Sequence, residues 1–173
     1  GTNEINDLVN GITYNPNLDF GLWQPLSLGN RVWFDTNNDG TQNGSEVGVA
    51  GVSLTLLDGS GNPVTSTVTG AAITAVTDAS GYYTFTDLIS GTYKVQVDGS
   101  NFQSGAKLVN YQNSSFSEAN ADANLDTQDN GINPATVAGY LSNGVVSGPI
   151  TLSAGSEPTG EDHLGASDNS TSS

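Results

Sequence analysis

The residues best suited to chemistry lie between positions 35 and 46, where oxygen-bearing side chains recur at every second position. Their spacing matches the twelve-residue calcium loop, whose ligands stand at the first, third, fifth, seventh, ninth and twelfth places. Gly40 occupies the place where such a loop turns sharply. Oxygen donors without His or Cys favour calcium over a transition metal. The predicted ligands are Asp35, Asn37, Asp39, the Thr41 carbonyl, Asn43 and Glu46.

The alternative interpretation of this segment is a polar Asn/Asp/Gly hairpin loop that matches by chance. The flanking residues 31–34 and 49–57 have the pattern of strands rather than helices, so a helix-opening sensor is not expected. A bound ion would be structural, because it would tie down a loop whose carboxylates repel one another. We therefore expect a stabilising calcium ion with a dissociation constant between about micromolar and millimolar.

A second acidic stretch, residues 122–129, repeats the every-second-residue oxygen pattern but lacks the glycine and the closing glutamate. It is either a second cation site, completed by carboxylates from elsewhere in the chain, or a solvated acidic loop. The sequence leaves both interpretations open. The candidate ligands of this second site are Asp122, Asn124, Asp126, Gln128 and Asp129.

The composition also indicates a cation as the counter-charge. The 173 residues include 18 Asp and Glu but 3 Lys and Arg, which gives a net charge of −15. So few cations cannot neutralise a run of phosphates, which excludes nucleic acid and an anionic membrane surface as partners. No apolar run approaches the roughly 20 residues of a membrane-spanning helix. The low lysine content and the absence of Cys and Met suit an extracellular protein.

Apolar residues alternate with polar ones along most of the chain, and no helical period of useful length appears. Short clusters of Gly, Asn, Asp, Ser and Pro separate these alternating runs. The spacing is typical of an antiparallel sandwich, so the predicted fold class is all-β. Residues 110–135 are predicted to form a long polar loop. The predicted strands are 52–56, 73–76, 82–86, 92–98 and 145–152.

The N-terminal region carries a separate strand pattern. In residues 17–23, Leu18, Phe20 and Leu22 fall on one face, and Trp23 ends the run before Pro25. A second strand-like run begins at Leu26, which suggests a hinge. The predicted organisation is an arm over 1–25, a sandwich over 26–160 and a polar tail over 161–173. The start at Gly1 rather than Met is typical of a processed or excised piece.

Four motifs follow one another in the predicted sandwich: LGNRVWFDTNNDG at 28–40, GVSLTL at 51–56, TDASGYYTF at 77–85 and GTYKV at 91–95. In this combination they resemble the B-type repeats of serine-aspartate-repeat surface adhesins, the SdrD B-like domains, which are relatives of the collagen-adhesin B module. Residues 126–134 and 152–159 are similar to the C-terminal half of that family. The resemblance implies an extracellular, calcium-stiffened, immunoglobulin-like or prealbumin-like β-sandwich, usually strung in tandem as a stalk or fibre.

The sequence departs from this family in two places. Some collagen-adhesin-type modules carry a Lys–Asn isopeptide bond whose Lys lies on the first strand. Arg31 stands there instead, so no such bond is expected, and Lys94 and Lys107 are expected to be ordinary surface residues. The family also closes its domain with a C-terminal strand resembling Asp-Phe-Gly-Phe. The comparable Leu18–Trp23 segment here precedes the module, and nothing similar follows Glu157.

This displacement predicts a donor-type strand. A sandwich without its last strand exposes an apolar groove and unpaired edges, and adding the arm of another copy would cover both. Head-to-tail contact of this kind does not close on itself and so grows a filament. Three arrangements stay open: separate subunits joined by strand donation, tandem repeats of one long chain, and an arm folded back on its own module. The predicted interface residues are Leu18, Phe20, Leu22 and Trp23.

An enzyme is not expected, because His163 is the single histidine and no nucleophile elbow, HExxH or phosphate loop is present. The alternative function is a monomeric surface adhesin module that binds a glycan or host ligand through Trp23, Trp33 and the tyrosines. Such aromatic residues more often pack in a core. Sequons at Asn113 and Asn169 leave glycosylation open. The sequence thus predicts an extracellular structural unit of a stalk or filament, stiffened by calcium and assembled with identical neighbours.

Overall fold

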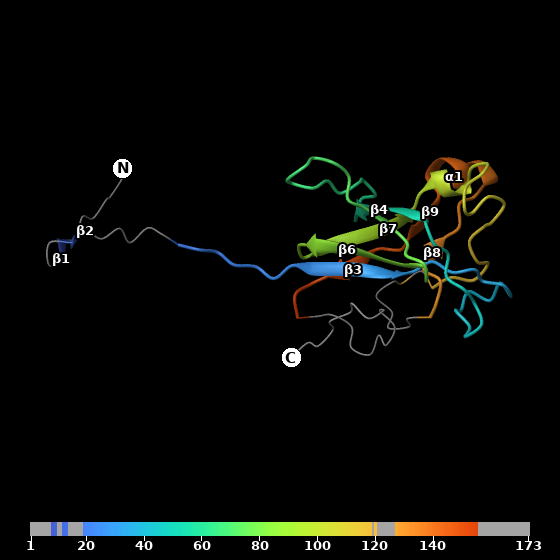
Figure 1. Ribbon diagram of the computed structural model, residues 1–173, viewed down its shortest axis with the longest axis horizontal. Coiled ribbons are helices and arrows are strands. Elements are labelled where there is room, and N and C mark those ends of the chain that lie inside the picture. The colour runs from blue at the N-terminus through green and yellow to red at the C-terminus, as the bar shows by residue number, and fades with distance from the viewer. Residues whose placement is uncertain (1–7, 10–11, 14–18, 119, 121–126, 156–173) are drawn as a thin grey trace.

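The structure is a computed structural model that describes residues 8–9, 12–13, 19–118, 120 and 127–155. Two antiparallel sheets form a sandwich, and an arm leaves one end of it (Figure 1). The smaller sheet pairs β3 (Leu26–Arg31) with β6 (Tyr82–Leu88). The larger sheet has the order β5 (Thr74–Val76), β4 (Ser53–Asp58), β7 (Gly91–Val97), β9 (Val145–Ser147) and β8 (Gly131–Ile132), and β10 (Ile150–Leu152) pairs with the first half of β7. The all-β sandwich expected from the sequence is confirmed.

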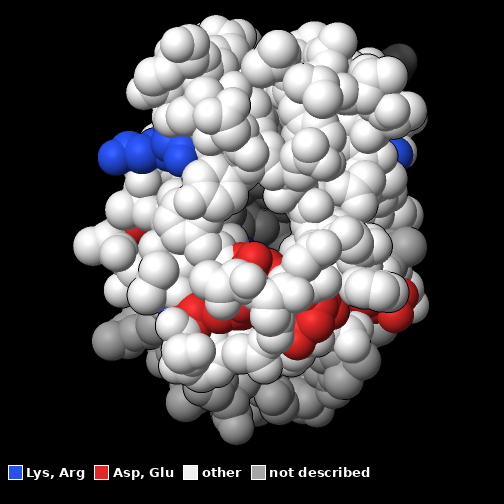
Figure 2. All heavy atoms as spheres, turned by 90° about the vertical axis from the view of Figure 1, so that its right-hand side faces the viewer, with Lys and Arg blue, Asp and Glu red and all other residues white. Residues whose placement is uncertain are grey.

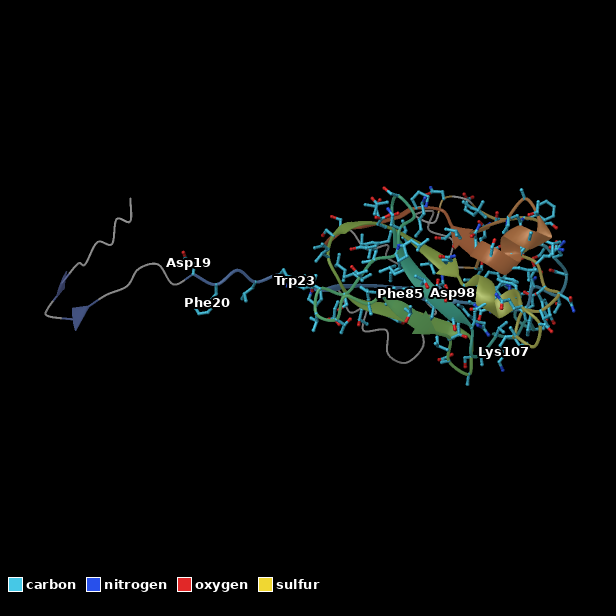
Figure 3. All side chains as sticks on the ribbon, turned by 90° about the horizontal axis from the view of Figure 1, so that it is seen from above. Asp19, Phe20, Trp23, Phe85, Asp98 and Lys107 are labelled. Atoms are coloured by element: carbon cyan, nitrogen blue, oxygen red, sulfur yellow. The ribbon has the colours of Figure 1, made fainter. Side chains whose placement is uncertain are left out.

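The core forms because strand alternation sends the apolar side chains of both sheets toward each other. In β4, Leu54 and Leu56 are fully buried, whereas the residues beside them along the strand, other than the buried Leu57, are half-buried. The register of β4 against β7 sets Leu54 opposite Val97 and Leu56 opposite Val95. Phe85 of β6 fills the space between the sheets and is 1% exposed (Figure 3). The predicted strands 52–56, 73–76, 82–86 and 92–98 correspond to β4, β5, β6 and β7, and the predicted strand 145–152 corresponds to two strands, β9 and β10.

The chain beyond β3 is anchored where three backbone segments meet. The Val32 N–H donates to the Gly81 carbonyl at 2.8 Å, and the Val49 N–H donates to the Val32 carbonyl at 2.8 Å. Gly81 has a φ of 87°, and a Cβ on it would lie 2.4 Å from the Val32 carbonyl oxygen, so a side chain does not fit here. The loop that begins at Asp35 therefore leaves from a fixed point of the sandwich.

Two strand boundaries differ from the sequence prediction. β3 ends at Arg31, before the predicted end at residue 34, and Trp33 keeps an isolated bridge to Gly48. The chain leaves the ladder here because it must turn into the loop after Phe34. In the same way, residues 49–52 precede β4 and are not part of its strand.

Two short helical elements were not predicted from the sequence. They are the 3₁₀ turn η1 (Gly99–Phe102) and the helix α1 (Val137–Asn143), which is capped by the Thr136 hydroxyl accepting from the Gly139 N–H at 3.1 Å. Each is too short to display a helical period in the sequence. Phe102 and Tyr140 from these elements pack edge to face with ring centroids 5.4 Å apart. The predicted loop over 110–135 also contains β8.

The arm begins with a feature that the sequence analysis missed. β1 (Leu8–Val9) pairs with β2 (Ile12–Thr13) in a short antiparallel hairpin. Leu18, and with it the start of the predicted strand 17–23, lies outside the described residues. Residues 19–25 carry no secondary structure, because no other described segment pairs with them.

The described part of the arm leads away from the sandwich, as Figures 1 and 3 show. Phe20, Leu22 and Trp23 are 81%, 95% and 60% exposed. These residues do not fold back onto their own module, as one of the three predicted arrangements required. The first buried residue after the arm is Leu26, directly behind Pro25.

Thr77 provides a test of the sandwich. Its buried hydroxyl donates to the Val49 carbonyl at 2.6 Å and accepts from the Val52 N–H at 2.8 Å. Thr77→Val leaves both backbone groups without this partner, so we expect the free energy of unfolding to fall by about 1–3 kcal/mol. Urea titration followed by fluorescence measures the change. Thr74→Val, on the exposed face of β5, is the control and should stay within about 0.5 kcal/mol of the wild type; equal effects at both positions would refute this role of Thr77.

Candidate metal loop and open pole

The predicted calcium loop is organised around the carboxylate of Asp35. Its Oδ1 accepts from the amides of Asn38 and Asp39 at 2.6 and 3.3 Å, and its Oδ2 accepts from the Gly40 amide at 2.9 Å. Burial raises the pKa of Asp35, but the hydrogen bonds from Ser114 and from these three amides outweigh it and hold that pKa below its usual value. The loop therefore wraps an ionised carboxylate with its own backbone N–H groups.

Asp39 lies beside Asp35 and is contacted by the two asparagines among the predicted ligands. Its carboxylate accepts from Asn37 Nδ2 at 2.8 Å and from Asn43 Nδ2 at 3.2 Å. The Thr41 N–H donates to Asp39 Oδ1 at 2.8 Å, and this bond is the main cause of the lowered pKa of Asp39. Rotation of either amide by half a turn would present its oxygen in place of its nitrogen.

Glu46, the twelfth residue of the motif, is 5% exposed although it carries a charge. Its Oε1 accepts from the Thr36 N–H at 2.7 Å and from the Thr36 hydroxyl at 3.1 Å, and its Oε2 accepts from the Asn43 N–H at 3.0 Å. These bonds connect the end of the loop to its beginning. Both oxygens of the buried carboxylate accept hydrogen bonds, as expected because a buried carboxylate without partners is costly.

The donor set fits calcium in its chemistry, because every predicted ligand is an oxygen-bearing group and the side chains already contact one another. Within the residues described, no three carboxylate or imidazole side chains converge on one point. Asp35 and Asp39 are neighbours, whereas Glu46 faces Thr36 and Asn43. Closing a shell around an ion would therefore require Glu46 to release one of its present contacts and the asparagine amides to rotate.

The second acidic stretch meets the first loop. Gln42 N–H donates to the Thr127 carbonyl at 2.7 Å, Asp129 N–H donates to the Gly40 carbonyl at 2.8 Å, and Thr41 bridges Gln128. The two segments predicted to bind cations thus run side by side. Because they are far apart in the sequence, the sequence did not reveal this contact. Of the second candidate set, Gln128 and Asp129 are placed here; Asp122, Asn124 and Asp126 lie outside the described residues.

A third segment, residues 113–115, completes this cluster; the sequence marked it as a sequon but not as a neighbour of the predicted cation segments. Asn113 Nδ2 donates to Asp129 Oδ2 at 2.7 Å and to the Gly131 carbonyl at 3.0 Å. Asn38 exchanges hydrogen bonds with Ser115 at 2.7 and 2.8 Å. The Asn113 nitrogen, to which a glycan would be attached, is therefore engaged inside the cluster, which disfavours glycosylation there.

Asp129 is the most perturbed carboxylate of the cluster. Its pKa is raised to about 6, chiefly by burial and to a smaller extent by the negative charge of Asp35, against hydrogen bonds from the Gly131 amide and Asn113 that lower it. Two carboxylates from distant parts of the chain are thus held close enough to repel each other. A bound cation is one arrangement that would relieve this repulsion.

The same end of the molecule is hollowed. Figure 2 views the molecule from the side opposite the arm and shows a depression near the centre, with Asp and Glu atoms along its lower rim. A cavity of about 190 Å³ lies between the smaller sheet and the β7–β9 part of the larger one. We call this end the open pole. Asp35, Asn113 and Asp129 line the cavity together with apolar residues that include Val95, Val97, Phe102, Leu108 and Val145.

Trp33 and Arg31 occupy contrasting positions beside the cavity. Trp33 lines it, and its indole Nε1 is buried with no hydrogen-bond partner among the described residues. Arg31 donates from Nε to the Ser80 carbonyl at 2.9 Å, and its guanidinium lies 5.2 Å from the centre of the Tyr82 ring. Arg31 is thus held on the surface, whereas Trp33 faces the interior rather than forming an exposed aromatic platform.

Comparison with known proteins gives one family. The profile of the family described as SdrD B-like domain matches residues 26–148. Over 83 residues the chain is 47% identical to serine-aspartate repeat-containing protein D of Staphylococcus aureus (strain Newman), which covers 47% of this chain and 6% of that protein. Over 85 residues it is 42% identical to serine-aspartate repeat-containing protein F of Staphylococcus epidermidis (strain ATCC 12228 / FDA PCI 1200), which covers 49% of this chain and 5% of that protein. The chain thus spans a small fraction of these relatives. Among the described residues, no helix is both long and apolar enough to cross a membrane.

The raised pKa of Asp129 predicts a pH dependence in the presence of a chelator. Because the folded-state pKa of about 6 exceeds the ordinary value of 3.8, the contribution of this group to stability is fully present below pH 4 and is lost as the pH rises through 6. Asp129→Asn removes this loss, which amounts to at most about 3 kcal/mol. Urea unfolding in EDTA from pH 4 to 8 should show the free energy of the wild type falling relative to the variant. Parallel curves for the two proteins would contradict the burial and repulsion described.

Proposed function

Because this chain belongs to the SdrD B-like domain family, we propose that it is a structural module of an extracellular stalk or filament, stiffened by calcium and joined head to tail by β-strand donation. The family is one of immunoglobulin-like surface-adhesin domains rather than of enzymes, and membership confirms the extracellular, cell-surface location expected from the sequence. The calcium and the head-to-tail assembly are the parts that we propose.

Calcium is supported by the loop and by the electrostatics around it. Asp35 and Asp39 are neighbours in a loop with the spacing of a calcium site, and the charge of Asp35 is felt by Asp129 in another segment. The chain as a whole carries a net charge of −15. A divalent cation with hard oxygen ligands suits this cluster better than any other common ion. Its role would be to fix the loop, since the flanking segments are strands or strand-like rather than helices.

The exposed arm is the observation that carries the proposal of strand donation. Phe20 and Leu22 are 81% and 95% exposed, so a single chain leaves apolar side chains in water next to a segment without ladder partners. Burying these two side chains would contribute on the order of 3–6 kcal/mol before the ordering entropy is subtracted. Within the described residues, β3 pairs with β6 and with no other strand.

Strand donation applies equally to separate subunits and to tandem repeats of one long chain. In both cases the arm of one module pairs with the next module, and the contact repeats without closing. The contacts predicted for Phe20 and Leu22 are the same in both arrangements. We therefore propose that the arm of one module packs against the next module, whether or not the two modules belong to one polypeptide chain.

Calcium stiffening is tested by thermal unfolding with calcium and with EDTA. At about 100-fold excess over the dissociation constant, calcium should add roughly 2.7 kcal/mol to the free energy of unfolding. Asp35→Asn and Glu46→Gln should remove most of this increase. Asp58→Asn is the matched control, because Asp58 accepts similar turn hydrogen bonds away from the loop; it should keep the response to calcium. A wild-type Tm that calcium leaves unchanged would end this part of the proposal.

Head-to-tail assembly is tested on the full chain with calcium present. Light scattering coupled to size exclusion should show concentration-dependent oligomers for the wild type, and electron microscopy should show rods. The double substitution Phe20→Asp and Leu22→Asp should leave single modules, because charged side chains cannot be buried in an apolar groove. Val68→Asp, at a residue that is 91% exposed outside the arm, should assemble like the wild type. A wild type that stays monomeric at high concentration would refute the assembly.

A further inference from the structure

We propose that the cavity at the open pole is the acceptor site for the arm of a neighbouring copy, and that the Phe20 ring fills it. This inference rests on the strand donation proposed above. It adds the place where the arm docks and the residue that anchors it. Three independent features of the described residues support it: the size and lining of the cavity, the buried Trp33 N–H, and the opposite positions of arm and cavity.

The volume of the cavity suits one aromatic ring. It measures about 190 Å³, and an apolar cavity of about 150 Å³ in another protein binds benzene. Val95, Val97, Phe102, Leu108 and Val145 are among its apolar lining residues, and polar side chains, including Asp35, Asn113 and Asp129, line it as well. Phe20 is the phenylalanine of the arm and is 81% exposed in the single chain. An incoming ring would bury its own apolar surface against the apolar part of this lining.

Trp33 lacks a partner that an added strand would provide. Its buried Nε1 has no hydrogen-bond acceptor among the described residues, although Trp33 lines the cavity. Buried donors are nearly always satisfied in native structures. The backbone of a donated segment carries a row of carbonyl groups, one of which can accept from this indole. The N–H is itself buried, so a donated segment would supply its acceptor if the indole shifts as the arm enters.

The cavity and the arm lie at opposite ends of the molecule. β3 runs from the arm-bearing end toward the open pole (Figure 1), where residues 30–35 line the cavity and the depression opens (Figure 2). Copies stacked along the long axis therefore bring the arm of one to the cavity of the next. Docking into its own cavity would require the chain to reverse within residues 21–25, whereas the described arm leads away.

The negative charges around the cavity allow Phe20 to enter it. Asp35 and Asp129 line the cavity, and Asp19 directly precedes Phe20 in the arm. Asp19 and Phe20 point to opposite sides of the arm (Figure 3), as successive residues of an extended chain do. When Phe20 enters the cavity, Asp19 consequently stays outside, so its charge is not buried beside the two acceptor carboxylates.

The test separates donor from acceptor in two full-length variants. Phe20→Ala removes the ring but leaves the cavity open, whereas Val145→Phe fills the cavity but leaves the arm intact. We expect each variant alone to remain a single module, with at least a 100-fold weaker association than the wild type. An equimolar mixture should form a two-module complex and stop there, because one intact arm and one open cavity remain. Light scattering measures the masses, and Val68→Ala is the control that should assemble like the wild type.

The outcomes of this experiment distinguish the cavity inference from the strand donation on which it rests. If the wild type and the Val145→Phe variant both form rods while Phe20→Ala does not, the arm docks elsewhere: the cavity inference is wrong and strand donation stands. If the wild type never associates, both are wrong. Val97→Phe, a second cavity-filling change, decides the matter where circular dichroism shows that Val145→Phe does not fold.

A second readout depends on no cavity-filling variant. The ¹⁵N-labelled Phe20→Ala chain is titrated with an unlabelled synthetic peptide of residues 15–24, and the indole N–H resonance of Trp33 is followed by NMR. Trp23→Phe assigns this resonance, since the chain has 2 Trp. We expect the Trp33 resonance to move downfield as the N–H gains an acceptor, and a peptide with Phe20→Ala to leave it unchanged. A Trp33 resonance that neither peptide moves would overturn the inference.

Discussion

The open pole depends on the burial of one carboxylate, Asp129, close to a second one, Asp35. One carboxylate begins the loop after β3 and the other precedes β8, and each is held by hydrogen bonds rather than by a basic side chain. A chain with 3 Lys and Arg among 173 residues has almost no cations with which to neutralise such a pair. Backbone amides and Asn113 offset part of the cost. A cation bound here, as proposed, would offset more of this cost.

The other unsatisfied features of the molecule gather at the same place. The cavity opens here, and the buried Trp33 N–H has no acceptor among the described residues. An added segment with an apolar residue facing inward could fill the cavity and bring an acceptor. Among the described residues, the arm is an exposed segment with that pattern.

Much of the sandwich could be predicted from alternation and turn residues. β4, β6 and β7 follow directly from runs such as Leu54 and Leu56, because burial on one face enforces a period of two. The loop over 35–46 could be recognised because its spacing is specific. The pairing of Gln42 with Thr127 could not be predicted, because no local sequence pattern shows which distant segments meet. The cavity likewise depends on how the two sheets are spaced, and α1 is too short for a periodic signal.

The metal loop and the acceptor cavity share the same backbone, which links the two proposed activities. Trp33 and Phe34 line the cavity, and the next residue, Asp35, begins the loop. Asp129 similarly lines the cavity while its N–H pairs with Gly40 inside the loop. A cation that fixes Asp35 and Asp129 would therefore also fix the walls against which an arm must pack. Because such coupling is reciprocal at equilibrium, a docked arm would in turn hold the carboxylates in place and strengthen cation binding, so filament growth and metal binding would rise and fall together.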